Sequence, residues 1–272
     1  MDVVDEDGSE KKGGSRIIGR ILPAAVGFWL RSQVEEIAQL EIDLEGRDRQ
    51  ILKGFIPGVA VSAQQAIYRG IHVGQVQLSA KDIRINIGQV VRGKPLRLLK
   101  TFPVTGAVVL SEADLKASLR SPLLSAGLLD FWRSLISIPA IAQDVKARYG
   151  SLAIQPNVVL SQPNIRLEEG CLGLSFYPCS SGNISSADSL ENKPVVLGAK
   201  LSVVSAQYLQ LSSPCWLTDL TELSVLASGS PVGIPVDSLE GFQWNLGQDT
   251  QLNQLETHPD RLVCSGVVTV QP

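Results

Sequence analysis

Residues 67–89 read IYRGIHVGQVQLSAKDIRINIGQ, and apolar and polar side chains alternate along most of this stretch. Val76 and Leu78 fall on one side of an extended chain, and the glutamines beside them fall on the other. Ile83 and Ile85 repeat the pattern a few residues later. Strict alternation is typical of strands with one apolar and one solvated face. The stretch therefore predicts two consecutive strands whose apolar side chains share one face of a sheet.

The chain continues with a basic run, VRGKPLRLLK at 91–100, and then with another alternating segment from Val104 to Leu110. Ser111-Glu112-Ala113-Asp114 follows as a capping box, the usual signal for the first turn of a helix. Leu115 and Leu119 fall on one side of that helix. The predicted order is strand, strand, basic crossover, strand and capped helix.

This order of elements resembles the LmeA-like phospholipid-binding proteins of bacteria, cyanobacterial members in particular. The carrying residues are the Ile67–Ile71 turn, the Val76–Ile87 strands and the segment Val108–Leu115. The similarity extends from about Val34 to the C-terminus and is clearest before Leu124. It implies an α+β fold in which a curved, mostly antiparallel sheet packs on a long N-terminal helix, similar to tubular lipid-binding (TULIP, BPI-like) domains. Lipid would lie between sheet and helix, and the family offers no catalytic residue to carry over.

Acyl chains require only apolar burial, which contributes about 0.8 kcal/mol per methylene group. A sheet face that side chains do not fill completely would therefore serve as a lipid groove. Each candidate position is equally compatible with an ordinary core. The candidates for lipid contact are Val76, Leu78, Ile83, Ile85, Val108 and, from the covering helix, Ile37.

The N-terminal region predicts one long helix from Arg16 to about Leu44, with a possible kink at Pro23. Its apolar run, Ile21 to Leu30, is far shorter than the roughly 20 residues that span a bilayer. A basic amphipathic helix with exposed aromatic residues can lie in a membrane interface, and it can equally pack on a sheet. The second half, with Val34, Ile37 and Leu44 on one stripe, favours packing.

Charge is unevenly distributed along the 272 residues. Residues 11–120 carry 17 Lys and Arg against 9 Asp and Glu, whereas residues 121–272 carry 7 against 13. A basic half suits an anionic surface, although a solvated face explains it as well. The candidates for membrane contact are Arg16, Arg20, Phe28, Trp29, Arg31, Arg92, Lys94, Arg97 and Lys100.

Residues 1–15 show no hydrophobic period and predict a disordered tail. Residues 16–272 are expected to form a single elongated lipid-binding domain, with two possible pseudo-halves that meet near residue 150. Helices are expected at 123–136, 141–149 and 217–227, and a polar loop at 178–192. Strand candidates after residue 150 lie at 152–154, 158–160, 165–167, 172–174, 195–211, 234–246 and 261–270.

Catalytic and metal-binding patterns are absent from the sequence. It contains no GxGxxG, GxxxxGK[ST] or GxSxG motif, and its two histidines, His72 and His258, stand in strand and turn contexts. The four cysteines form no CxxC pair and predict free thiols, with a Cys171–Cys179 bridge as the alternative in an oxidising compartment. We therefore expect a protein that is not an enzyme and holds neither metal nor cofactor.

The expected function is binding of phospholipid or another acyl lipid at an anionic membrane surface, in lipid transport or in envelope or thylakoid maintenance. The alternatives are an assembly scaffold that uses the basic run against an unknown acidic protein and, less favoured, a lipid hydrolase. Nucleic acid is not expected as a partner, because the basic run lacks stacking aromatic residues. Family members outside cyanobacteria often look exported. The acidic start here predicts a cytoplasmic, peripherally membrane-associated protein, with export left open.

Overall fold

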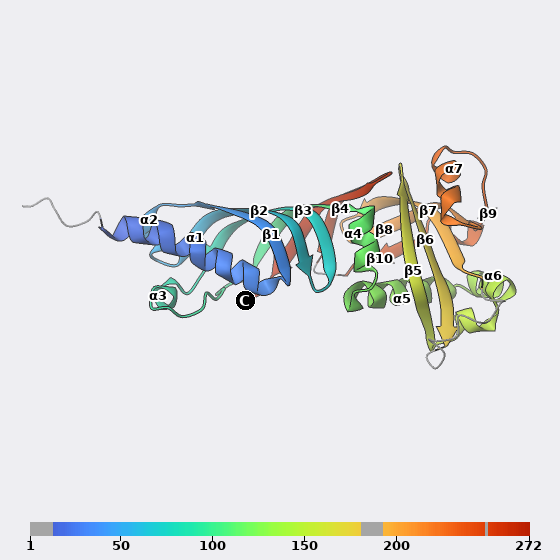
Figure 1. Ribbon diagram of the computed structural model, residues 1–272, viewed down its shortest axis with the longest axis horizontal. Coiled ribbons are helices and arrows are strands. Elements are labelled where there is room, and N and C mark those ends of the chain that lie inside the picture. Colours follow the sequence, from blue (N-terminus) through green and yellow to red (C-terminus); the bar gives the residue numbers. More distant parts are fainter. Residues whose placement is uncertain (1–12, 181–192, 248–249) are drawn as a thin grey trace, which may run out of the picture.

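The computed structural model describes residues 13–180, 193–247 and 250–272, and its strand pairs are all antiparallel. The first sheet has six strands in the order β1-β2-β3-β4-β12-β11, so the C-terminal hairpin returns to the N-terminal part of the chain (Figure 1). The strands of this sheet are β1 (Glu36–Glu45), β2 (Phe55–Tyr68), β3 (Ile71–Arg84), β4 (Phe102–Ser111), β11 (Thr250–His258) and β12 (Arg261–Val270).

The second sheet follows the order β10-β8-β7-β6-β5, and β9 pairs with β8 beside that path. Two backbone hydrogen bonds tie it to β11: Leu252 N–H donates to Ala206 at 2.6 Å, and Gly170 N–H donates to Thr257 at 2.9 Å. Its strands are β5 (Val158–Glu168), β6 (Cys171–Ser180), β7 (Val195–Ser205), β8 (Tyr208–Trp216), β9 (Ile234–Pro235) and β10 (Gln243–Asn245). The α+β class with large antiparallel sheets is confirmed.

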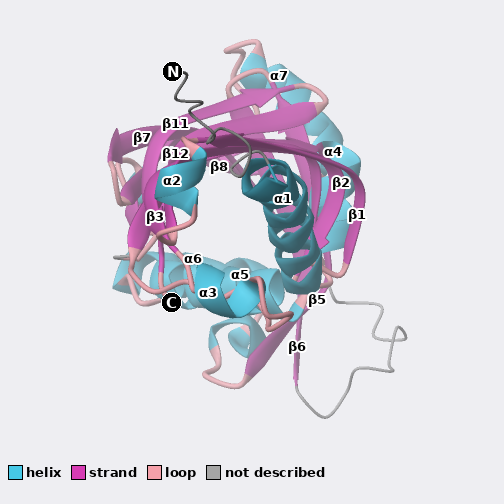
Figure 2. Ribbon diagram, turned by 90° about the vertical axis from the view of Figure 1, so that its left-hand side faces the viewer, coloured by secondary structure: helices cyan, strands magenta, loops and turns pink. Residues whose placement is uncertain are grey.

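The helices lie along and at the ends of the sheets. Figure 2, viewed along the long axis, shows the first sheet curving around the side on which α1 lies. The longer helices are α1 (Gly13–Gln33), α4 (Glu112–Ser118), α5 (Pro122–Ile136), α6 (Pro139–Tyr149) and α7 (Leu223–Ala227). Single turns are α2 (Asp48–Ile51), α3 (Ile87–Val90), η1 (Ser151–Ile154), η2 (Leu220–Glu222) and η3 (Asp237–Leu239).

The predicted long N-terminal helix is wrong in its second half, since α1 ends at Gln33 and residues 36–45 form β1. Leu40, Ile42 and Leu44 are half-buried at alternate positions, the strand period, and pair with Ala63, Val61 and Val59. Residues 37 and 44 are seven positions apart, which also places them on one face of a helix, and this spacing led to the helix prediction. Ile37 therefore belongs to the sheet and not to a covering helix.

The β2–β3 hairpin closes through the turn expected from the sequence. Arg69 and Gly70 have φ values of +50° and +74°, as a two-residue type I′ turn requires, and Tyr68 pairs with Ile71. Residues 76–87 do not form two strands, because β3 continues to Arg84 through Asp82, whose φ is +57°. This left-handed residue shifts the alternation by one position, so that Ile83 is buried on the face that Ala80 also faces.

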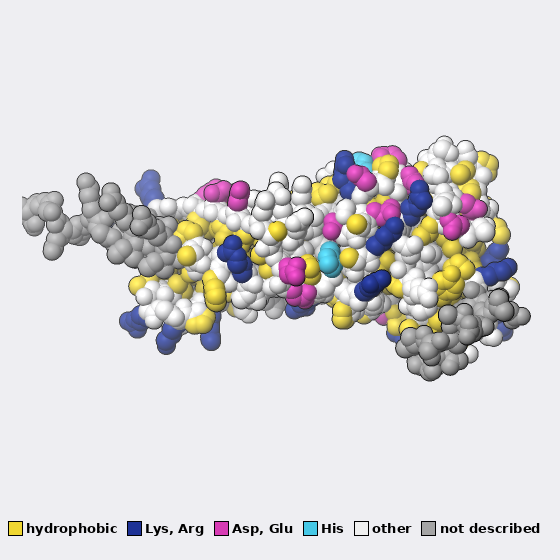
Figure 3. All heavy atoms as spheres, viewed as in Figure 1, with side chains coloured by type: hydrophobic (Ala, Val, Ile, Leu, Met, Phe, Trp, Pro, Cys, Tyr) yellow, Lys and Arg dark blue, Asp and Glu magenta, His cyan; other side chains and the backbone are white. Residues whose placement is uncertain are grey.

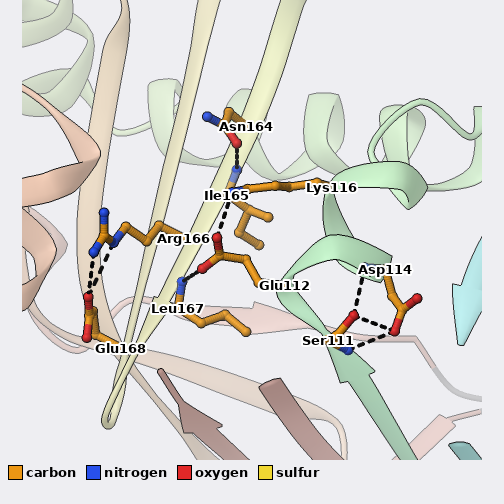
Figure 4. Close-up of polar contacts among 9 residues, drawn as sticks. All are labelled: Ser111, Glu112, Asp114, Lys116, Asn164, Ile165, Arg166, Leu167 and Glu168. Carbon is orange, nitrogen blue, oxygen red and sulfur yellow. Dashed lines mark hydrogen bonds and ion pairs between the residues drawn. The ribbon is translucent and has the colours of Figure 1, made fainter. Parts of the chain in front are cut away.

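The capping box at the start of α4 is confirmed. Ser111 Oγ accepts from Asp114 N–H, and the Asp114 carboxylate accepts from Ser111 N–H, as Figure 4 shows. In the next position, Glu112 accepts the N–H of Leu167 on β5 at 2.9 Å and pairs with Lys116 at 2.6 Å (Figure 4). This carboxylate therefore links α4, which follows the first sheet, to the edge of the second.

Several other sequence-based assignments are corrected by the structure. The basic run 91–100 lies in a loop between neighbouring antiparallel strands β3 and β4 and is not a crossover. Residues 152–154 form a 3₁₀ turn, the expected strand 234–246 is two short strands around another such turn, and the helix expected at 217–227 begins only at 223. The sequence patterns predicted no secondary structure for most of β2 or for any of β11.

Part of the expected tail (1–12) and most of the expected polar loop (181–192) lie outside the described residues, and residues 13–15 belong to α1. Within the described ranges, no single helix has both the length and the apolar composition of a membrane span. In the part of the chain that the structure describes, α5 and α6 taken together reach that length and composition, but the pair is bent by 107°.

Candidate functional site

The curved side of the first sheet encloses an apolar space that we call the first cavity, with a volume of about 160 Å³. One wall is the inward stripe of α1, where Val26, Trp29 and Leu30 recur at helical spacing. The other walls come from β1 to β4, the end of β12 and the loop after α3. The sheet and loop residues are Leu44, Ile56, Val59, Val61, Leu78, Ser79, Ala80, Ile83, Ile85, Leu96, Leu98, Phe102, Val104 and Val270.

Of the six residues predicted to contact lipid, Leu78, Ile83 and Ile85 line the first cavity. Asp82 brings them together, because an uninterrupted strand would place Leu78 and Ile83 on opposite faces. Val76, Val108 and Ile37 line neither this cavity nor the second one described next. The sequence pattern did not reveal the contribution of Trp29 and Leu96.

A larger apolar space, the second cavity, lies between α4, α5 and the second sheet and has a volume of about 260 Å³. Its walls carry no charged side chain. They comprise Leu115, Leu119, Leu124, Leu128, Phe131, Ile165, Leu172, Leu174, Leu197, Ala199, Leu201, Leu209, Leu211, Trp244, Leu255 and Leu262. Leu115 and Leu119 are the two residues that the capped helix was expected to present on one side.

A row of apolar residues crosses the first sheet between the two cavities. Strand register places Ala63, Val76, Val108, Cys264 and Leu255 side by side on five neighbouring strands. Paired residues of antiparallel strands point to the same face, so this row forms one apolar surface. It begins at Ala63, two residues from Val61 of the first cavity, and ends at Leu255 of the second. The two predicted residues Val76 and Val108 therefore connect the cavities.

The end of the molecule that carries α1, α2 and α3 combines exposed apolar and basic side chains (Figures 1 and 3). Phe28 is 76% exposed and Leu99 is 61% exposed, and Leu52 and Val91 are also exposed. Each of the last three directly precedes a lysine or arginine in sequence. We call this surface the apolar–basic tip; its cations include Arg31, Lys53, Arg92, Lys94, Arg97 and Lys100.

The other predicted membrane-contact residues divide between the tip and the interior. Trp29 is half-buried because it lines the first cavity, whereas Phe28 points outward. Arg16 and Arg20 belong to α1, but their side chains lie outside the part that is described. Residues 83–100 carry five cations and no carboxylate. Among the described residues, no ion pair joins Arg31, Arg92, Lys94, Arg97 or Lys100 to a carboxylate.

The cysteines of the chain are free thiols. Cys171 and Cys179 stand at opposite ends of β6, eight residues and roughly 26 Å apart at 3.3 Å per residue, too far for a disulfide. Burial raises the pKa of Cys171 and Cys264, and burial together with the nearby Cys171 and Glu222 raises that of Cys215 to about 11. At neutral pH these three groups are therefore protonated and poor nucleophiles.

The two histidines lie in a strand and at a strand end, where they contact backbone and side chains of neighbouring elements. His72 pairs with Ile67 in the β2–β3 hairpin, and its N–H donates to Ser118 Oγ at 2.8 Å. The ring of His258 lies beside two carboxylates, with Nδ1 3.3 Å from Glu169 and Nε2 3.6 Å from Glu256. Within the described ranges, no group of three or more His, Cys, Asp and Glu side chains could hold a metal ion.

Comparison with known proteins gives one match. The family model described as LmeA-like phospholipid-binding matches residues 13–267, nearly the whole chain. No curated protein and no solved structure matches. The match covers α1, the second sheet, the second cavity, all of the first sheet except the last three residues of β12, and every lining residue of the first cavity except Val270. The chain therefore belongs to the LmeA-like phospholipid-binding family.

Proposed function

We propose that this protein holds the acyl chains of a phospholipid in its two cavities and collects that lipid at an anionic membrane surface. The observation that carries the proposal is the pair of apolar cavities joined by an apolar row, within a chain of a phospholipid-binding family. Cavities lined by aliphatic and aromatic side chains stay dry and bind apolar ligands. The helix and curved sheet around the first cavity favour a tubular lipid-binding arrangement.

The size of the first cavity fits part of an acyl chain. Its volume of about 160 Å³ compares with the roughly 150 Å³ of an engineered apolar cavity that binds benzene. A segment of about six carbons therefore fits, and its burial contributes on the order of 5 kcal/mol at about 0.8 kcal/mol per methylene. The second cavity, about 260 Å³ in volume, accommodates a longer segment.

The apolar–basic tip supports contact with a membrane. Phe28 and Leu99 are large apolar side chains that remain exposed, and the neighbouring cations have no carboxylate partner among the described residues. Insertion of such side chains removes apolar area from water. Each cation near an anionic surface adds about 1 kcal/mol. Lipid transport or membrane maintenance would follow from repeated collection and release at such a surface.

Native mass spectrometry of the purified protein tests lipid binding directly, and we expect bound phospholipid. A protein-interaction scaffold would carry none, so the absence of lipid would contradict the proposal. Turnover assays on phospholipid would detect a hydrolase instead. The membrane part is tested separately by cosedimentation with vesicles of phosphatidylglycerol and phosphatidylcholine.

For the vesicle assay, Leu99→Ser removes an exposed apolar side chain from the tip, and Val204→Ser removes one that is 50% exposed on β7. We expect Leu99→Ser to lower the vesicle affinity about tenfold, because full burial of such a side chain is worth about 1.5–3 kcal/mol. Val204→Ser should leave it unchanged. Raised salt should weaken binding, since exposed charges are screened. Equal sedimentation of both variants would reject the tip as the docking surface.

A further inference from the structure

A groove lies on the outside of α1, on the side away from the core, and we call it the outer groove. It is bounded by one face of α1 and by the loop after α3, and its volume is about 520 Å³. Ala24, Ala25, Phe28 and Ser32 form the helical side, since positions four apart lie on one face of a helix. The loop side includes Lys94.

Two side chains, Trp29 and Leu96, line both the outer groove and the first cavity. Trp29 lies at the border of two helix faces, between the buried stripe that includes Val26 and the outward stripe that includes Phe28. Leu96 is buried, whereas its neighbours at 91–95 and 97 are exposed. Trp29 and Leu96 therefore form a partition between the groove and the cavity.

The two sides of this partition are held differently. Asn86 fixes the loop on both sides of Leu96, because its Nδ2 donates to the Pro95 carbonyl at 3.0 Å and its Oδ1 accepts from Arg97 N–H at 2.7 Å. Among the described side chains of α1, none forms a hydrogen bond to another element. The described side chains of α1, at 22–33, therefore hold the helix by apolar packing, and Pro23 interrupts its backbone hydrogen bonds. Trp29 is therefore held by fewer hydrogen bonds than the loop that carries Leu96.

The composition of the outer groove matches the polar end of a phospholipid. Its floor is apolar, Lys94 is exposed at its rim, and Arg92 and Arg97 flank it on the same loop. A lysine ammonium is a common partner of phosphate groups. Phe28 lines the groove and is also part of the apolar–basic tip, so the groove opens where the tip would meet a membrane.

We propose that the outer groove is the passage by which a phospholipid enters the first cavity and the subsite that then holds its anionic headgroup. Trp29 moves aside to admit the acyl chain, and Lys94 pairs with the phosphate. This inference rests on the proposed function, because it assumes that lipid occupies the first cavity. A lipid that follows this path passes from the bilayer to the cavity without exposing its chains to water.

Transfer of phosphatidylglycerol with a fluorescent acyl chain, from vesicles to the full-length protein, measures passage through the groove. Ala24→Trp fills the groove from an exposed position on α1, and Ala126→Trp makes the same change at an exposed position on α5 outside both cavities. We expect Ala24→Trp to slow the transfer about tenfold or more and Ala126→Trp to leave it unchanged. Trp29→Ala should accelerate the transfer.

The headgroup assignment is tested with phosphatidylcholine that carries the same fluorescent chain. Lys94→Glu should lower uptake of phosphatidylglycerol relative to phosphatidylcholine, because the new carboxylate repels the net negative headgroup of phosphatidylglycerol, whereas the choline cation of phosphatidylcholine offsets the repulsion of its phosphate. Arg49→Glu reverses an exposed charge on α2, outside the groove, and should leave that ratio as it is in the wild type. An unchanged ratio in Lys94→Glu would overturn the headgroup subsite.

The outcomes separate the two proposals. Lipid bound to the wild type, together with equal transfer rates for Ala24→Trp and Ala126→Trp, would overturn the passage and leave lipid binding intact. No lipid in native mass spectra and no transfer to the wild type would overturn both proposals.

Discussion

Replacing Leu78 by tryptophan distinguishes a lipid cavity from an ordinary core. Leu78 is half-buried on β3 between Val61 and Gly106, and it faces the first cavity. If the cavity of about 160 Å³ is open, the indole ring extends into it and displaces the acyl segment. If the space is closed by side chains in solution, the larger residue overpacks it, which costs about 1–3 kcal/mol.

The two cases differ in magnitude and in observable. Loss of a six-carbon segment removes on the order of 5 kcal/mol of binding free energy, which corresponds to roughly a thousandfold or greater loss of affinity. Overpacking by about 1–3 kcal/mol would lower the Tm of a chain of this size by roughly 2–12 °C, at 2–4 °C per kcal/mol. An open cavity therefore predicts a large loss of lipid with little change in Tm.

The assay measures Tm and the amount of extracted phospholipid on the same preparations of wild type, Leu78→Trp and Val204→Trp. The last variant adds the same ring at an exposed position of β7 that lines neither cavity, and it should match the wild type in both measurements. A wild type without lipid, combined with a large fall in the Tm of Leu78→Trp, would refute the cavity as a lipid site. Full lipid content in Leu78→Trp would place the lipid elsewhere.

Three further predictions concern the scaffold. Burial opposes ionisation of Glu112, but hydrogen bonds from Lys116 and Leu167 N–H, with the charges of Lys116 and Arg166, together lower its pKa below the usual 4.5. The ionised Glu112 carboxylate therefore stabilises the folded protein fully above pH 4.5, and this contribution is lost as pH falls through the lower folded-state pKa. In urea unfolding, Glu112→Gln should lower the free energy of unfolding by up to about 1 kcal/mol at pH 7 and should have no effect in strong acid. Asn86→Ala removes the two hydrogen bonds that flank Leu96 and should lower the free energy of unfolding by about 1 kcal/mol, which corresponds to a fall in Tm of roughly 2–4 °C. An unchanged Tm would show that these hydrogen bonds do not stabilise the loop. Thiol titration without reductant should give four thiols in denaturant and slow reaction of the three raised-pKa thiols in the native protein; fewer than four would reveal a disulfide.

The sequence by itself determined the local features whose causes lie within a few residues. Alternation at period two predicted the strand face of Val76 and Leu78, because the pleat alone imposes that period. The Ser111–Asp114 capping box predicted the start of α4, since both hydrogen bonds form between residues three apart. The Arg69-Gly70 turn follows from the tolerance of glycine for a positive φ. The family resemblance rested on these same features.

Only the tertiary structure decided which surfaces meet. Residues 36–45 fit both a helix and a strand, and pairing with β2, about 20 residues further along the chain, selected the strand. The sequence predicted a common face for Leu78, Ile83 and Ile85 on two strands, whereas the structure keeps them on one face of the single strand β3 through the left-handed conformation of Asp82. Whether that face is filled or leaves a cavity depends on side chains from other elements, including Trp29 on α1 and Leu96 in the loop after α3. A cavity is the volume that side chains from several elements fail to fill, so no local pattern encodes it.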